Sequence, residues 1–442
     1  MPKTFDLILR NGTVVNHDGR VERDIGVTAG RIAELGDLSQ ADAGETIDMT
    51  GLHVLPGVVD SQVHFREPGN EHKEDLGTGS RAAVMGGVTA VFEMPNTNPL
   101  TTDAGALADK IKRAHHRMFC DFAFYMGGTR DNAAQLRELE LLPGCCGVKV
   151  FMGSSTGSLL VEDDDGVAAV LANITRRAAF HSEDEFRLRE RVGEQVEGDP
   201  SSHPVWRDVR AAVMCTERLL RLAREAGKRV HVLHISTAEE MRLLADNKDV
   251  ASVEATPQHL TLAGPDAYDR LGTLAQMNPP LRDEANRAGI WWGLERGVVD
   301  VLGSDHAPHT LDEKGAPYPK SPSGMPGVQT LVPVMLDHVN AGRLTLERFV
   351  DLTSHGPGRI FQLAGKGRTA VGYDADFTVV DLKARRTITN DWSQSRSGWT
   401  PFDGREVTGW PVATFIRGRQ VMSDGEIIGE AGGEAVRFQE AL

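Results

Sequence analysis

Five side chains of types that can bind metal ions stand far apart in the sequence, each at the end of a largely apolar run. They are His64, Lys149, His181, His234 and Asp305. In parallel α/β barrels the catalytic groups lie where the buried strands end. Imidazole and carboxylate ligands favour zinc (Zn²⁺), with manganese, cobalt or iron as alternatives. The five residues therefore predict a site for one or two divalent metal ions.

A metal at this site would promote hydrolysis, because it lowers the pKa of a bound water to near neutrality and polarises a carbonyl group. Asp305 follows the apolar run Val301-Leu302-Gly303-Ser304. Its carboxylate could ligate the metal, take the proton from the hydroxide and pass it to a departing nitrogen. The indicated reaction is the hydrolysis of an amide-like bond.

Lys149 lies within the strand-like segment Gly147-Val148-Lys149-Val150-Phe151. A functional role requires a depressed pKa, because only the neutral amine can add carbon dioxide. The resulting carbamate, N6-carboxylysine, is an anionic ligand able to bridge two metals. The alternative is a lysine that reaches out of its strand.

The segment from Asp60 to Arg66 departs from a simple ligand pattern. Because side chains alternate along a strand, residues 60, 62, 64 and 66 should share one face. Gln62 stands where a second histidine would be expected beside His64. His231, three residues before His234, should lie on the opposite face of its strand and have a structural role.

Composition narrows the class of protein. The chain has 442 residues, 40% hydrophobic and 25% charged, as is usual for soluble globular proteins, and a formal net charge of −15. That charge argues against nucleic-acid binding, so an anionic substrate would need a local cationic pocket. No long apolar run indicates a signal peptide or a membrane span, which predicts a cytoplasmic protein. The cysteines Cys120, Cys145, Cys146 and Cys215 are expected to be reduced and to pack in the interior.

The middle of the chain alternates apolar strands with amphipathic helices, which predicts a parallel (β/α)8 barrel. An open doubly wound sheet is less favoured, because no Gly-rich phosphate turn follows the first strand. The expected helices include 102–117, 207–227 and 237–246. The expected strands are 54–60, 88–94, 119–125, 146–151, 178–181, 229–235, 251–256 and 298–304.

Both ends of the chain read as short strands separated by glycine-containing turns, in 4–55 and in 370–430. We therefore expect a split β-sandwich domain made of residues 1–55 and 366–442, with the barrel at 56–365. The Gly- and Pro-rich stretch 315–327 is expected to be a surface loop or a lid over the active site.

Motifs along nearly the whole chain resemble the amidohydrolase superfamily and, within it, the dihydroorotases. They are PGVVDSQVHFREPG (56–69), EMPNTNP (93–99), GVKVFMGSSTG (147–157), HSEDE (181–185), HVLHIST (231–237), EATPQHL (254–260), MNPPLR (277–282) and GSDHAPH (303–309). The resemblance implies reversible hydrolysis of (S)-dihydroorotate to N-carbamoyl-L-aspartate, a step of pyrimidine biosynthesis. It also implies a small-molecule substrate, a homo-oligomer (dimer or tetramer) and, as a further partner, an enzyme of the same pathway.

The resemblance also assigns substrate-binding residues. Arg66, Asn96 and His309 correspond to a clamp for the substrate carboxylate, and Asn278 corresponds to a contact with the pyrimidine ring. Arginine is the natural fork for a carboxylate, and Arg66 lies two residues past His64. Taken singly, the two asparagines could be turn or cap residues, and His309 an exposed loop residue.

Gln62 departs from the family, which has histidine at both ends of an HxH triplet. Three outcomes remain open: one metal, a second metal held loosely by His64, Lys149 and Asp305, or a dihydroorotase-like scaffold that binds without turnover. The retained clamp and Asp305 favour catalysis. The rival enzyme is a ring amidase similar to hydantoinase or allantoinase.

Overall fold

The computed structural model describes residues 4–154 and 159–439. At its centre, eight parallel strands stand side by side in chain order. This confirms the predicted (β/α)8 barrel. The strands are β8 (Val58–Val63), β9 (Val88–Glu93), β10 (Asp121–Gly127), β11 (Cys145–Phe151), β12 (Ala178–His181), β13 (Val230–Val232), β14 (Ala251–Ala255) and β15 (Val301–Leu302).

The barrel closes between its last and first strands. Val63 forms a parallel bridge with His306, and the backbone N–H of His64 donates to the carbonyl oxygen of His306 over 2.7 Å. This closure brings the carboxyl end of β8 beside the segment that follows β15. Residues more than 240 positions apart in the sequence thereby meet, as the 243-residue separation of Gln62 and Asp305 shows.

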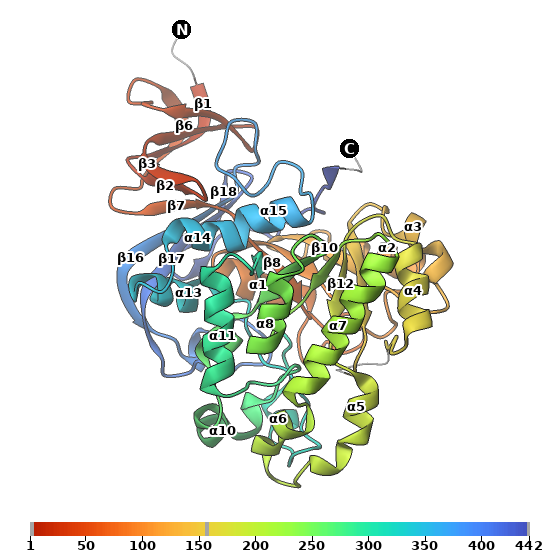
Figure 1. Cartoon of the computed structure of the whole chain (residues 1–442). Coiled ribbons are helices and arrows are strands. Elements are labelled where there is room, and N and C mark those ends of the chain that lie inside the picture. The colour runs from red at the N-terminus through yellow and green to blue at the C-terminus, as the bar shows by residue number, and fades with distance from the viewer. Residues whose placement is uncertain (1–3, 155–158, 440–442) are drawn as a thin grey trace.

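Helices cover the outside of the barrel (Figure 1). Their apolar stripes pack on the strands; in α7, for example, Ala212, Cys215, Leu219 and Leu222 are buried at helical spacing. The longer helices are α1 (Leu76–Met85), α2 (Ala104–Ala114), α4 (Asp164–Ala172), α7 (Val209–Glu225), α8 (Ala238–Ala245), α11 (Glu284–Glu295) and α13 (Leu331–Asn340). Shorter ones are α3 (Leu136–Leu139), α5 (Glu185–Glu190), α6 (His203–Trp206), α9 (Pro257–Thr261), α10 (Asp266–Leu271), α12 (Leu311–Lys314), α14 (Leu346–Val350) and α15 (Gly356–Ile360).

Most of the longer helices begin with an acidic or hydroxyl N-cap. The cap side chain accepts a hydrogen bond from a backbone N–H of the first turn, which would otherwise lack a partner. The caps are Asp75, Asp103, Asp163, Asp208, Thr237 and Asp283. Each fixes the point at which the chain, after the carboxyl end of a strand, turns into a helix.

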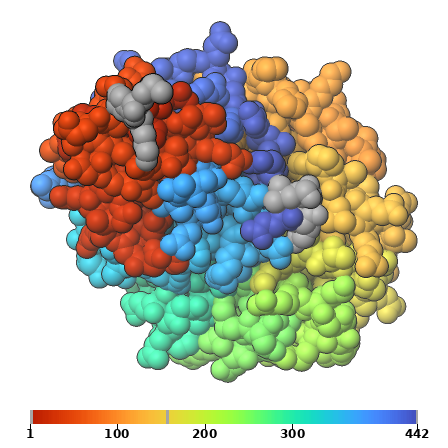
Figure 2. All heavy atoms as spheres, turned by 90° about the horizontal axis from the view of Figure 1, so that it is seen from above, coloured from red at the N-terminus to blue at the C-terminus, as the bar shows by residue number. Residues whose placement is uncertain are grey.

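A β-sandwich flanks the barrel and is made from both ends of the chain. Strand β16 pairs with β7 on one side and β17 on the other, and Leu9, Val54, Phe377 and Phe415 share its buried core. In Figure 2 the red N-terminal segment borders blue C-terminal atoms. The strands are β1 (Thr4–Arg10), β2 (Thr13–Asn16), β3 (Gly19–Glu22), β4 (Asp24–Thr28), β5 (Arg31–Gly36), β6 (Asp42–Asp48), β7 (His53–Pro56), β16 (Phe377–Thr387), β17 (Glu406–Ile416), β18 (Arg419–Ser423) and β19 (Glu426–Ile427).

The strand pairing in the sandwich differs in part from the series of hairpins predicted from the sequence. The turns at Asp18-Gly19 and Gly30 do connect antiparallel pairs, but β1 pairs in parallel with β6, and β2 in parallel with β7. Distant strands therefore share a sheet, a pairing that local turn residues do not encode. The domain boundaries at 55/56 and 365/366 stay a prediction.

The first barrel strand also begins later than expected. The predicted strand 54–60 divides into β7, which belongs to the sandwich, and β8. A shift of strand register between Asp60 and Val63 interrupts the expected alternation. Ser61 therefore bonds the barrel residue Glu254 over 2.7 Å while the neighbouring Gln62 bonds Asp305. Within the described residues, no helix combines the length and the apolar character that crossing a membrane requires.

Candidate metal centre and active site

The carboxyl ends of the barrel strands surround one small polar pocket. Its lining includes Gln62, His64, Arg66, His181, His234, Asn278 and Asp305, together with Phe151, Ala307, Ser323 and Gly324. Most of the residues singled out in the sequence thus converge. Asn96, His309 and the β11 residue Lys149 are not among the lining residues, but Asn96 contacts His64 and His309 contacts Arg66.

Two imidazoles in this pocket have the spacing of neighbouring zinc ligands. Nδ1 of His181 lies 3.2 Å from Nε2 of His234. Two nitrogens bound tetrahedrally to one zinc ion, each at about 2.0–2.1 Å, stand about 3.3 Å apart. Burial lowers the pKa of both imidazoles, which keeps them neutral and able to donate a lone pair.

A carboxylate fixes the orientation of His181. Nε2 of His181 donates to Glu183 over 2.9 Å, and Arg207 in turn donates to Glu183 over 2.7 Å. Since Nε2 carries the proton, Nδ1 is the nitrogen left to bind a metal. Neither Glu183 nor Arg207 was predicted from the sequence. The acidic residues that follow His181 could have indicated Glu183.

Lys149 is a buried amine with no hydrogen-bond partner among the described residues. Its Nζ lies 4.4 Å from the centre of the Phe151 ring. Burial lowers the pKa of Lys149 to about 7, although the negative charges of Asp305 and Glu254 oppose this. An amine that is half neutral near pH 7 meets the chemical requirement for carbamate formation.

These observations test whether the side chains fit a metal. In the part of the chain that the structure describes, no three His, Cys, Asp or Glu side chains are grouped closely enough to hold a metal ion by themselves. His181 and His234 supply two ligands at the right spacing, and the unpartnered amine of Lys149 can supply the third as a carbamate. The donor set fits a divalent metal on that condition.

His64 and Gln62 both contact Asp305. Nε2 of His64 lies 3.3 Å from Oδ1 of Asp305, and the amide nitrogen of Gln62 donates to the same oxygen over 2.9 Å. On its other side, Nδ1 of His64 donates to the side-chain oxygen of Asn96 over 2.8 Å. Asn96 therefore orients His64 here, a contact that the carboxylate-clamp prediction did not include.

Asp305 has the properties of a proton carrier. Burial raises its pKa to about 7, although the positive charge of Lys149 lowers it. A carboxyl group with a pKa near the working pH can both accept and release a proton.

The backbone at the site is held in an uncommon conformation. Arg66, His234 and Asp305 have φ angles of 63°, 36° and 45°, in the left-handed region that residues other than glycine seldom adopt. Such conformations cost about 1–3 kcal/mol each and gather at functional sites.

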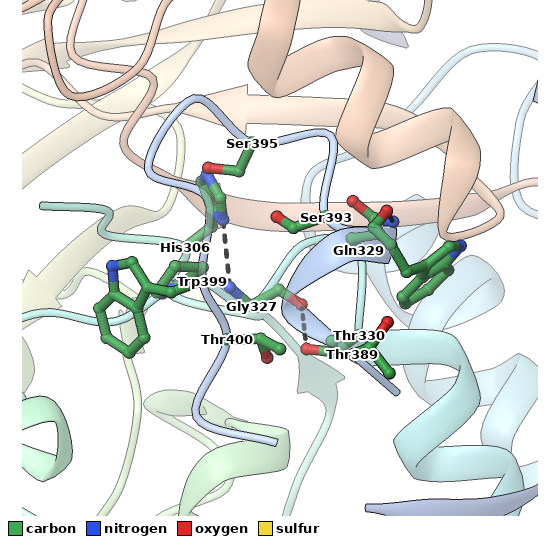
Figure 3. A pocket seen from close by; sticks show the side chains of 11 residues that line it. His306, Gly327, Gln329, Thr330, Thr389, Ser393, Ser395, Trp399 and Thr400 are labelled. Carbon is green, nitrogen blue, oxygen red and sulfur yellow. Dashed lines mark hydrogen bonds between the residues drawn. The ribbon is translucent and has the colours of Figure 1, made fainter. Parts of the chain in front are cut away.

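A hydrogen-bond network holds the segment after Asp305. As Figure 3 shows, the ring of His306 faces the backbone of Gly327, whose N–H donates to Nδ1 over 3.1 Å. Nε2 of His306 donates to Glu74 over 3.2 Å, and Ser395 also donates to Glu74. The residue that follows Asp305 is thus fixed from two sides.

A cationic group stands beside the proposed metal centre. The guanidinium of Arg66 is 4% exposed, and it contacts the carbonyl oxygen of Pro308 at 3.2 Å and Nε2 of His309 at 3.3 Å. Lys73, which sequence reasoning missed, lies 3.1 Å from Nδ1 of His309. Arg66 forms no ion pair with a carboxylate among the described residues. Its charge is therefore available to an anionic substrate.

Asn278 lines the opposite part of the pocket. Its side-chain oxygen accepts a hydrogen bond of 2.9 Å from Nε2 of His203. This bond does not use the hydrogen-bond donors of its amide nitrogen. His231, expected to be structural, is buried and bonds Ser252 over 2.8 Å.

Comparison with known proteins agrees with this geometry. The model of the Amidohydrolase family matches residues 53–421. The chain belongs to the amidohydrolase family. It is 36% identical to a dihydroorotase of Methanothermobacter thermautotrophicus over 96% of both chains, and 34% identical to an L-hydantoinase of Paenarthrobacter aurescens over 97% of both. The structure of L-hydantoinase (dihydropyrimidinase) from Arthrobacter aurescens has a TM-score of 0.93 and 32% identity, and covers 98% of this chain and 100% of that one.

The pocket of this amidohydrolase is nearly closed. Its free volume is about 20 Å³, which is room for about one water molecule. Ser323 and Gly324, from the 315–327 segment, form part of its wall. A ring-shaped substrate therefore needs this wall to move, and the role of the segment as a lid stays a prediction.

Proposed function

We propose that this amidohydrolase is a dihydroorotase-type enzyme that reversibly hydrolyses (S)-dihydroorotate to N-carbamoyl-L-aspartate in pyrimidine biosynthesis. The observation that carries the choice of substrate is the buried guanidinium of Arg66 in the pocket wall, which pairs with no carboxylate in the part of the chain that the structure describes. A buried cation is costly unless it is matched, and a substrate carboxylate matches it with two parallel hydrogen bonds.

The same proposal assigns a role to each residue of the site. His181, His234 and carboxylated Lys149 would hold a divalent metal, zinc in the first instance, with His64 and Asp305 available to a second ion. The metal would supply Lewis acidity and an acidified water. Asp305, with a pKa near 7, would take the proton of the attacking water and deliver it to the ring nitrogen as the C–N bond breaks.

The remaining residues would orient the substrate. Arg66 and His309 would bind its carboxylate and Asn278 would bind the ring, while Asn96 would position His64. A narrow pocket with little free volume also excludes bulk water. Each of these assignments is open to single substitutions.

Replacing Arg66 tests the substrate directly. In Arg66→Met, kcat/KM for dihydroorotate should fall at least about 100-fold, because the two hydrogen bonds to a charged group contribute about 1.5–3 kcal/mol each. Turnover of an uncharged ring such as hydantoin should change by less than about threefold. The matched control is Arg210→Met, which removes an exposed arginine of α7 that has no ion pair in the described part of the chain.

The second candidate is a hydantoinase-type ring amidase, which the likeness to L-hydantoinase in sequence and structure favours. It predicts equal losses on both substrates in Arg66→Met, or turnover of hydantoin alone in the unaltered protein. A protein that binds metal and turns over no cyclic amide would instead be a scaffold. A dimeric or tetrameric state, association with a pathway enzyme and a cytoplasmic location remain proposals alongside these.

A further inference from the structure

A second cavity, of about 510 Å³, lies at the other end of the barrel, where strands β11, β12 and β13 begin. Five of its lining residues are arginine or lysine, and none is aspartate or glutamate. The lining consists of Cys146, Thr175, Arg176, Arg177, Gly227, Lys228, Arg229, Arg359, Ile360, Phe361 and Gln362. The net charge of the chain is −15, so this cavity differs in sign of charge from the molecule as a whole.

The cavity is separate from the candidate active site. Arg177 directly precedes β12, which ends at His181, and Arg229 directly precedes β13, which leads to His234. Cys146 lines the cavity from β11, three residues before Lys149. With a rise of about 3.3 Å per residue, the two ends of these strands are about 10 Å apart or more.

Three of the five cations of the cavity, Arg177, Lys228 and Arg229, form no ion pair with a carboxylate among the described residues. Nη1 of Arg177 is buried and has no hydrogen-bond partner within the described residues, and Arg229 is exposed and forms no ion pair there. Lys228 donates to the carbonyl oxygen of Ile174 over 2.6 Å. One nearby carboxylate, Asp300, bonds Arg359 over 3.2 Å, but it is shared with Lys248.

The pKa of Arg177 reflects repulsion between the positive charges of the cavity. Burial, with the charges of Arg229 and Arg359, lowers the pKa of Arg177 to about 10, against the opposing effect of Asp300. An anion in the cavity would relieve this repulsion and provide acceptors for the unmatched N–H groups.

We propose that this cavity binds a phosphate-bearing small molecule. Arginine forks match the oxygens of a phosphate group, and several converging cations favour a ligand with more than one negative charge. The volume is within the range of small-molecule sites, and Ile360 and Phe361 offer an apolar wall to an organic moiety. The site is independent of the proposed reaction.

The test is calorimetric titration of the full chain with inorganic pyrophosphate. We expect saturable binding of one pyrophosphate per chain, weakened at least tenfold in Arg229→Gln and in Arg177→Gln. Arg229 is exposed, so its variant keeps the fold even if the half-buried Arg177 does not tolerate substitution. The matched control Arg210→Gln removes the same charge from an exposed arginine at the start of α7 that does not line the cavity, and it should bind as the unaltered protein does.

Two further arms locate the ligand. Arg66→Gln, which alters the cation of the active-site pocket, should leave pyrophosphate binding unchanged. A nucleoside triphosphate is titrated in the same way. An affinity equal to that of pyrophosphate indicates that the site recognises the phosphate chain alone, and a higher affinity indicates added contact with the apolar wall. Both results support the site. The proposal is overturned by absence of saturation, by equal affinity for sulfate, by equal weakening in Arg210→Gln, or by loss of binding in Arg66→Gln.

Discussion

At the scale of single residues, Gln62 decides how the carboxylate of Asp305 is held. Its amide nitrogen donates to Asp305, and its oxygen is buried without a partner among the described residues. A neutral amide oxygen is a weaker metal ligand than an imidazole. We therefore propose that Gln62 acts on a bound metal through Asp305 and that the site holds one ion tightly.

Restoring a histidine should change the metal content. We predict that the purified protein holds about one zinc per chain and that Gln62→His holds about two, because histidine adds a strong nitrogen ligand. Elemental analysis of both proteins, prepared identically, measures this. Gln62→Leu serves as the control, since it removes the hydrogen bond to Asp305 without adding a ligand. Equal zinc in Gln62→His and in the unaltered protein would contradict the prediction.

Lys149 should make metal loading depend on pH. Its neutral form adds carbon dioxide, and with a pKa of about 7 that form rises from about a tenth at pH 6 to about nine tenths at pH 8. Metal-free protein given ¹³C-labelled carbon dioxide and zinc should therefore form roughly tenfold more carbamate at pH 8, at equal dissolved carbon dioxide. Carbon NMR detects the product, and Lys149→Met is the blank. A signal that persists in that variant, or that does not change with pH, rules this out.

At the scale of elements, the strands were predictable because each is an apolar run of strand length followed by polar residues. The ends of β9 and β12 agree with the sequence to within one residue. The register shift between Asp60 and Val63 was not predictable, because it depends on how β8 meets β9 and β15. For the same reason Arg207 behind Glu183, and Asn96 against His64, could not be found from local patterns: each contact joins residues far apart in the chain.

The 315–327 segment closes on the pocket through a glycine. Gly324 has φ of 136°, and a Cβ there would lie 2.4 Å from the carbonyl oxygen of Ala307. Gly324→Ala should therefore push the segment outward, raise KM for the substrate and lower stability by about 1–3 kcal/mol. Steady-state kinetics and thermal unfolding measure both effects. Gly315→Ala, in the same segment but exposed and with φ of −72°, is the control and should behave as the unaltered protein.

At the scale of the whole molecule, a buried ionic cluster ties the sandwich to the barrel. Nζ of Lys366 lies 2.8 Å from Asp121, at the start of β10, and also pairs with Asp376, just before β16. Burial raises the pKa of Asp121, but Lys366 and Arg417 more than offset this and hold it below its usual value. Lys366 and Arg417 together thus keep Asp121 charged, whereas burial raises the pKa of Asp376 and Lys366 is the cation that opposes this.

Removing that lysine should destabilise the entire molecule. We predict that Lys366→Met lowers stability by about 3–5 kcal/mol, because it leaves Asp376 buried without its cation. The loss should be smaller at low pH: a carboxyl with a depressed pKa, such as Asp121, contributes stability above its unfolded pKa that is lost as pH falls. Thermal unfolding of Lys366→Met and of the exposed control Lys320→Met, at pH 7 and pH 4, measures this. A control that melts as low as Lys366→Met would refute it.

The pairing of β7 with β16 also has a consequence for biosynthesis. Pro56 lies opposite Phe377, so about 320 residues leave the ribosome between the two partners. At about 5–20 residues per second this takes roughly 15–60 s, during which β7 presents an unpaired edge. Strand β7 must wait until β16 has left the ribosome, and a chaperone that shields exposed edges would protect it from aggregation.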